Sequence, residues 1–279
     1  MKDLTFVINL EPYTHSFSDT VSKDSQKMCL MLCESIRLLG MYSPILIISA
    51  NGNMPNEETI SKLSGFGAKF DRTILKEKPF NGYFNKIYAY EYLSKKVSTP
   101  YVCFIDVDVL FLKPLDAAFI KASLKDNTII SALGYEPIPY IPEGLEVGPK
   151  YLRVFKNEEC ELYMRTTYNF TKYNSFSSGV MFFKNDANLQ NIMYNWLLNA
   201  EAMSNDENIK KYYTSEIFDM NTLTDADVLS QIITKEKAIV LQIPELVHYH
   251  TFESIPHVFK DIEMSDHMRM LLTKYKIDC

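Results

Sequence analysis

Two aspartates interrupt an otherwise apolar stretch, YVCFIDVDVLF at residues 101–111, and their spacing favours metal binding. In an extended segment, residues two apart share a face, so Asp106 and Asp108 are predicted to point the same way while Val107 packs inward. Neighbouring carboxylates repel unless one is protonated or a cation lies between them. A divalent cation resolves this most simply, and oxygen ligands suit Mn²⁺ or Mg²⁺.

Position distinguishes this pair from a chance match. A D-x-D spacing is a weak signal by itself, and the chain has a second one, Asp225 and Asp227 in LTDADVLSQIITK. For that second pair an ordinary helix N-terminus is the alternative, because acidic residues there favour the helix dipole. Asp106 directly follows the apolar run 101–105, so it is predicted at the carboxyl end of a parallel strand, where open α/β sheets bind ligands.

A second group of candidate ligands lies near the end of the chain, in ELVHYHTFE. His248 and His250 are two residues apart, so they share a face if this segment is extended. Both a metal site and an ordinary surface loop are compatible with this pattern.

The elements expected to position these residues alternate between strands and helices. Apolar, β-branched runs predict strands at 4–10, 44–49, 101–105, 128–133, 176–183 and 238–244. Helical spacing predicts helices at 24–40, 185–203 and 223–235, and the Pro- and Gly-rich segment 134–150 is expected to be a loop. This alternation is typical of an α/β fold with a mainly parallel sheet flanked by helices.

Composition narrows the classes of function. The chain has 279 residues and a formal charge of −6 without a run of five like charges, which argues against nucleic-acid or anionic-membrane binding. Five cysteines without paired C-x-x-C spacing predict neither a disulfide framework nor a zinc site. No apolar run approaches the ~18 residues of a membrane span, so a soluble, cytoplasmic protein is expected.

Taken together and in order, four segments resemble the GT-A fold nucleotide-sugar glycosyltransferases. They are NKIYAYEYLSKKVSTPYVCFIDVDVLFLKPL, SSGVMFFKND, DADVLSQII and VHYH. The pattern is most similar to glycosyltransferase family 8, which contains glycogenin and bacterial lipopolysaccharide galactosyltransferases, and the resemblance spans about residues 4–252. It implies a Rossmann-like GT-A sheet with a smaller antiparallel portion on the acceptor side. We expect one domain, divided into a nucleotide-sugar half (1–133), an acceptor and catalytic half (134–260) and a C-terminal helix (261–279).

The resemblance also implies a ligand set for the metal. In the family, the D-x-D carboxylates hold Mn²⁺ against the donor diphosphate, which assigns this role to Asp106 and Asp108, with Mg²⁺ as an alternative cation. A later histidine before an aromatic residue completes the shell; His248 matches this position best, and His250 is the fallback. Two carboxylates, one imidazole and two diphosphate oxygens give a near-octahedral shell.

Other matched positions imply contacts to the donor and the acceptor. Asp225 and Asp227 are expected to be catalytic residues that hydrogen-bond sugar hydroxyls. Many family members carry D-Q-D at this position, whereas this chain has Ala226, which leaves open whether the reaction retains or inverts the anomeric configuration. The expected donor-binding residues are Asn9, Leu10, Tyr13, Lys86, Asp106, Val107, Asp108, Ser178 and Gly179.

The expected reaction is transfer of a hexose from a UDP-sugar to an acceptor hydroxyl on a carbohydrate or protein-linked glycan, with retention favoured by the family. Two other classes stay open. An inactive transferase would be a non-catalytic nucleotide-sugar-binding protein. A phosphatase of the haloacid-dehalogenase type uses the first aspartate of a D-x-D as nucleophile, although its motif normally follows the first strand of the domain. The sequence does not determine the oligomeric state.

Overall fold

The computed structural model describes residues 2–10, 20–49, 54–73, 75, 85–135, 151–153, 158–169, 173–175, 178–212, 225–233, 238–248 and 266–275. Its strands are β1 (Leu4–Asn9), β2 (Ile45–Ile48), β3 (Ala68–Asp71), β4 (Tyr101–Ile105), β5 (Val109–Phe111), β6 (Ile129–Tyr135), β7 (Tyr151–Arg153), β8 (Tyr173–Ser175), β9 (Val180–Lys184) and β10 (Ala238–His248). Its helices are α1 (Thr20–Leu38), α2 (Glu57–Gly65), α3 (Asn85–Ser94), α4 (Ala117–Asp126), α5 (Glu158–Tyr168), α6 (Ala187–Ser204), α7 (Glu207–Tyr212), α8 (Asp225–Ile233) and α10 (Asp266–Tyr275).

An eight-stranded mixed sheet forms the centre of the molecule, in the order β3-β2-β1-β4-β9-β6-β10-β5. The pairs among β3, β2, β1 and β4 are parallel, as is β6 with β10. β9 runs antiparallel to both of its neighbours, and β5 runs antiparallel to β10. The described residues also form a two-stranded antiparallel sheet of β7 and β8. The predicted α/β fold, with a mainly parallel sheet and an antiparallel portion, is confirmed.

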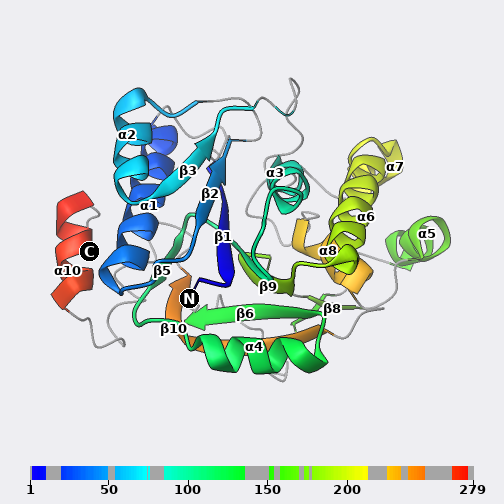
Figure 1. Cartoon of the computed structure of the whole chain (residues 1–279). Helices are drawn as coiled ribbons and strands as arrows, with labels where there is room; N and C mark the ends of the chain where they lie inside the picture. The colour runs from blue at the N-terminus through cyan, green and yellow to red at the C-terminus, as the bar shows by residue number, and fades with distance from the viewer. Residues whose placement is uncertain are drawn as a thin grey trace.

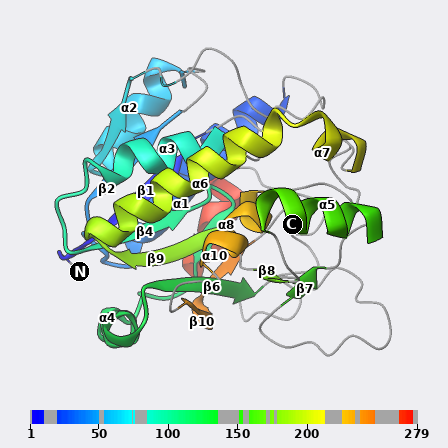
Figure 2. The same ribbon diagram turned by 90° about the vertical axis from the view of Figure 1, so that its right-hand side faces the viewer.

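Each face of the sheet is covered by its own set of helices, because successive strand residues point to opposite faces. Phe6, Ile8 and Ile105 pack in one apolar core with residues of α1, α2, α4 and α10. Val7 and Phe104 pack in the other core with residues of α3, α5, α6, α7 and α8. In Figure 1, α1, α2 and α10 accordingly lie on one side of the central strands, and α3, α6 and α8 on the other. Figure 2 shows α3 and α6 running side by side.

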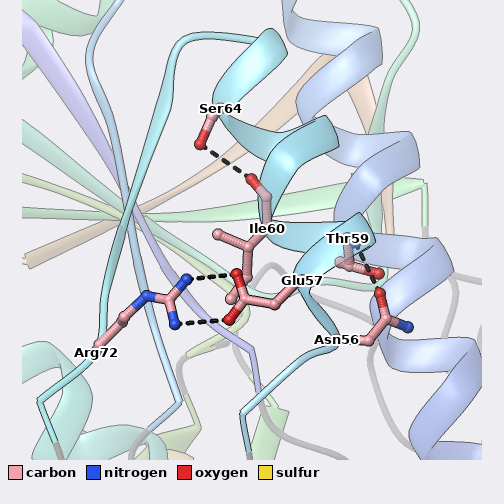
Figure 3. A network of polar contacts seen from close by, with 6 residues as sticks. All are labelled: Asn56, Glu57, Thr59, Ile60, Ser64 and Arg72. Carbon is pink, nitrogen blue, oxygen red and sulfur yellow. Dashed lines mark hydrogen bonds and ion pairs between the residues drawn. The ribbon is translucent and has the colours of Figure 1, made fainter.

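Side-chain caps fix where several helices begin. Asn56 accepts a hydrogen bond from the backbone N–H of Thr59 at 2.7 Å, which satisfies one of the free donors at the start of α2. In the same turn, Glu57 accepts two hydrogen bonds of 2.7 Å from Arg72, just after β3, so the helix is tied to the strand that it precedes (Figure 3). Asp116 and Asp186 cap α4 and α6 in the same way as Asn56 caps α2.

Most predicted strands appear close to their expected bounds, with two informative differences. β10 continues to His248, four residues beyond the predicted strand, and β9 begins at Val180 because Ser178 and Gly179 form a bend. Most of the predicted loop 134–150 lies outside the described residues. The four cysteines in the described part are buried free thiols, as expected. Across the described helices, none combines the length and the apolar character that crossing a membrane requires.

Candidate donor and metal site

Several strands end at the carboxyl edge of the sheet, which is the side where the parallel strands terminate, and most candidate residues lie there. β1 and β4 are parallel, so their carboxyl ends point the same way. β9 runs in the opposite direction, which brings the bend at Ser178 and Gly179, just before its first residue, to the same edge. β6 and β10 run parallel to β4, so His248 at the end of β10 also lies there. The topology therefore gathers residues from four separate parts of the chain.

Asp106 and Asp108 lie in a turn rather than in an extended strand. β4 ends at Ile105, and residues 106–108, here named the aspartate turn, lead into β5. The chain must turn here because β5 does not continue beside β4. It pairs with β10 and is the outermost strand of the sheet. The prediction of a carboxyl-end location is confirmed, whereas the prediction of an extended segment is wrong.

The aspartate turn is largely buried. Val107 is 3% exposed and packs in the apolar core, as its hydrophobic side chain requires. Asp108 is 2% exposed, and Asp106 retains 15% of its side-chain surface. Buried carboxylates need compensation by hydrogen bonds or by positive charge.

Asp106 already has a positive partner within the chain. Lys86, at the start of α3, places its Nζ 2.9 Å from Asp106 Oδ2, and both side chains are about 15% exposed or less. The sequence predicts that Lys86 contacts the donor and that a divalent cation relieves the carboxylate repulsion. In the structure, the Lys86 ammonium also compensates the charge of Asp106 directly.

A tyrosine that was not predicted from the sequence also contacts this carboxylate. Tyr90 donates its hydroxyl hydrogen to Asp106 Oδ1 at 2.9 Å. It lies four residues after Lys86 in α3, and residues at this spacing share a helix face. The spacing in NKIYAYEYL places Tyr90 beside Lys86, but only the docking of α3 on the sheet brings both side chains to Asp106.

The position of α3 is fixed by contacts to α6. Tyr88 donates a hydrogen bond of 2.5 Å to Glu201, and Ser94 donates one of 3.2 Å to Gln190. Burial and the bond to Glu201 raise the pKa of the Tyr88 phenol, so this group stays a hydrogen-bond donor throughout the physiological range. These ties hold the helix that carries Lys86 and Tyr90 against the end of β4.

The ends of β1 and β9 border the aspartate turn. The last pair between β1 and β4 joins Ile8 to Ile105, so Asn9, the last residue of β1, and Asp106, the first residue after β4, both follow this pair directly. Asn9 is 8% exposed, and Leu10 donates its N–H to the Ile48 carbonyl at 2.7 Å. On the other side, the Asp106 N–H donates to the Gly179 carbonyl at 2.8 Å. The structure thus brings together the expected donor-binding positions at residues 9–10, 86, 106–108 and 178–179.

The remaining candidates are placed by backbone alone or lie outside the described residues. In the pairing of β10 with β5, His248 lies opposite Val109, the residue that follows Asp108. Asp225 and Asp227 lie in the first turn of α8. The side chains of His248, Asp225 and Asp227 are outside the described part. Tyr13 and His250 also lie outside it. Among the side chains that are described, no three of His, Cys, Asp and Glu gather as a metal site.

Comparisons with known proteins give similarity at the level of the fold. No family model matches the chain. No curated protein sequence matches it significantly. Among solved structures, the glycosyltransferase GlyE from Streptococcus pneumoniae TIGR4 is 12% identical with a TM-score of 0.49, covering 100% of this chain; the chain spans 61% of GlyE. The galactosyltransferase LgtC, solved with donor and acceptor sugar analogs, is 11% identical with a TM-score of 0.48, over 96% of this chain and 99% of LgtC.

A nucleotidyltransferase is equally similar. CMP:2-keto-3-deoxy-manno-octonic acid synthetase, solved with CTP, is 9% identical with a TM-score of 0.49, and the similarity covers 98% of this chain and 99% of that protein. Similarity at this level does not assign an activity, because one fold hosts many different functions.

Proposed function

We propose that the chain is a metal-dependent glycosyltransferase that moves a hexose from a UDP-sugar to an acceptor hydroxyl. The observation that carries the proposal is the aspartate turn. Two carboxylates lie at the carboxyl end of a central strand. The Asp106 carboxylate accepts hydrogen bonds from Lys86 and Tyr90 of α3, and the Asp106 backbone N–H donates to the Gly179 carbonyl. Such an edge is where α/β sheets bind nucleotides.

The donor set of the aspartate turn fits Mn²⁺ or Mg²⁺. Asp106 and Asp108 supply carboxylate oxygens, which these cations prefer, and both carboxylates are shielded from bulk water. His248, beside the turn by strand pairing, is the proposed third ligand. When bound, the cation would supply positive charge to stabilise the nucleoside diphosphate as it departs.

The chain's own residues have roles in binding and orientation. Lys86 places a positive charge beside Asp106, where it favours the binding of an anionic donor to a protein whose formal charge is −6. Gly179 lacks a side chain, which lets the sugar or acceptor approach the backbone beside Asp106. Asn9 and Leu10, at the end of β1, are proposed to contact the nucleotide base.

We further propose that Asp225 and Asp227 bind hydroxyls of the donor sugar or the acceptor. Both lie in the first turn of α8, whose Val228 and Leu229 pack in the same apolar core as α3 and α6. This packing fixes the start of α8 relative to the helix that carries Lys86. Ala226 lies between these two carboxylates. We propose a retaining reaction on the resemblance to glycosyltransferase family 8 alone.

The test is turnover of a panel of UDP-sugars with Mn²⁺, measured as UDP and free sugar released. We expect slow, Mn²⁺-dependent hydrolysis of one donor, which becomes faster when the right acceptor is added. Binding of a UDP-sugar without any turnover would instead indicate a non-catalytic binding protein. Cleavage of phosphate monoesters would indicate the phosphatase chemistry, and either result would refute the proposal.

A further inference from the structure

Contacts from two separate parts of the chain hold Asp106. Its backbone N–H donates to Gly179 just before β9, its Oδ2 accepts from Lys86, and its Oδ1 accepts from Tyr90. Both side-chain contacts measure 2.9 Å and come from one face of α3. The carboxylate is therefore held at both oxygens, which fixes its rotation as well as its place.

Tyr90 is itself held by packing. It is 0% exposed, and its ring centroid lies 4.7 Å from that of Phe104 in β4 and 6.3 Å from that of Trp196 in α6. Phe104 precedes Asp106 by two residues, so the ring packs against the same strand that delivers the carboxylate. The position of the hydroxyl is consequently set by the core of the protein rather than by a surface side chain.

We propose that Tyr90 is a positioning residue that orients the Asp106 carboxylate for a divalent cation. This inference rests on the proposed function, because that function places a cation at Asp106 and Asp108. Each carboxylate oxygen has two lone pairs, so a phenol donor on Oδ1 leaves capacity for a metal. Hydrogen bonds to ligating groups fix their orientation, and their loss typically weakens metal binding about 10- to 100-fold.

Tyr88 provides a matched control on the same helix. Its hydroxyl also donates to a carboxylate, but the acceptor is Glu201 of α6. Replacing either tyrosine by phenylalanine removes one hydroxyl from α3 and keeps the ring. If Tyr90 only helps to hold α3 in place, the two replacements should change cation binding by similar amounts. If Tyr90 positions Asp106, only the replacement of Tyr90 should weaken cation binding.

The experiment is a titration of Mn²⁺ into wild type, Tyr90→Phe and Tyr88→Phe, with free Mn²⁺ followed by electron paramagnetic resonance and thermal unfolding measured in parallel. We expect the Mn²⁺ dissociation constant to rise about tenfold in Tyr90→Phe and to change less than about twofold in Tyr88→Phe. Equal affinity in wild type and Tyr90→Phe would overturn the positioning role and leave the proposed function intact. An equal loss in both variants would also overturn it, because packing of α3 would then explain the effect.

Two further outcomes are decisive. If wild type binds no Mn²⁺, with or without UDP, both the proposed function and this inference are wrong. If Tyr90→Phe does not fold, 4-fluorophenylalanine at position 90 replaces it, since its fluorine fills much of the space of the hydroxyl but donates no hydrogen bond. Mn²⁺ affinity equal to that of wild type in that protein would overturn the positioning role, and a loss of about tenfold would support it.

Discussion

Replacing Lys86 by methionine tests the role of the Lys86 ammonium separately from that of the proposed metal ion. The change removes the ammonium that lies 2.9 Å from Asp106 and keeps an apolar side chain of similar length. Breaking a fully buried ion pair costs about 3–5 kcal/mol. Lys86 and Asp106 each retain about 15% of their side-chain surface, and Tyr90 still donates to Asp106, so we expect a loss of about 2 kcal/mol in unfolding free energy without metal.

The same change is expected to strengthen Mn²⁺ binding. Two unit charges 4 Å apart interact by about 4 kcal/mol at an effective dielectric constant of 20, so removing the ammonium removes a strong repulsion toward a cation at Asp106. Allowing for residual water, we expect roughly tenfold tighter Mn²⁺ binding, about 1.4 kcal/mol, and weaker binding of UDP. Denaturant unfolding measures the change in stability, and calorimetry measures the binding of Mn²⁺ and UDP. Lys86→Arg is the control variant because it keeps the positive charge. Mn²⁺ affinity equal to or below that of wild type in Lys86→Met would refute the reasoning.

Two further predictions concern stability away from the site. Asp71 at the end of β3 is largely buried, which raises its pKa, but hydrogen bonds from Lys96 and Thr73 outweigh burial and lower the pKa to about 2. The contribution of Asp71 to stability is therefore complete above about pH 4 and is lost as the pH falls toward 2. Asp71→Asn should lower the unfolding free energy by about 1–2 kcal/mol at pH 7 and by much less near pH 2.5. A pH-independent difference in urea unfolding would contradict this assignment. Glu34 in α1 accepts hydrogen bonds from Lys274 and Tyr275 of α10, and its side chain is 12% exposed whereas that of Lys274 is 50% exposed. Glu34→Gln should therefore destabilise the protein by about 1 kcal/mol and Lys274→Met by less than about 0.5 kcal/mol, and the reverse order in thermal denaturation would show that the exposed cation dominates.

The sequence predicted the sheet well because its strands are buried on both faces. YVCFI and LTFVIN are mainly apolar runs, and both form strands at the predicted positions. The sequence did not predict the short β5, because VLF follows the aspartates without a turn signal. Only the long-range pairing of β5 with β10 shows that the chain turns at residues 106–108.

The candidate site was predicted in part. The strand-end position of Asp106 follows from the βαβ pattern. Its closeness to Gly179 instead depends on the antiparallel pairing of β4 with β9, which the sequence did not predict. The ion pair with Lys86 and the bond from Tyr90 depend on how α3 docks on the sheet, and this docking is set by ring packing and by ties to α6 that lie 96 to 113 residues away in sequence. Such tertiary contacts leave no local pattern.

The most direct test of the proposed function is a crystal structure of the protein grown with Mn²⁺ and UDP, with anomalous diffraction collected at the manganese edge. We predict one strong anomalous peak within coordination distance of Asp106 and Asp108, with diphosphate oxygens on its open side. We also predict that the peak is absent from crystals of Asp108→Asn. A manganese peak elsewhere in the molecule, or UDP bound at this edge without any metal, would contradict the assignment of the aspartate turn as the metal site.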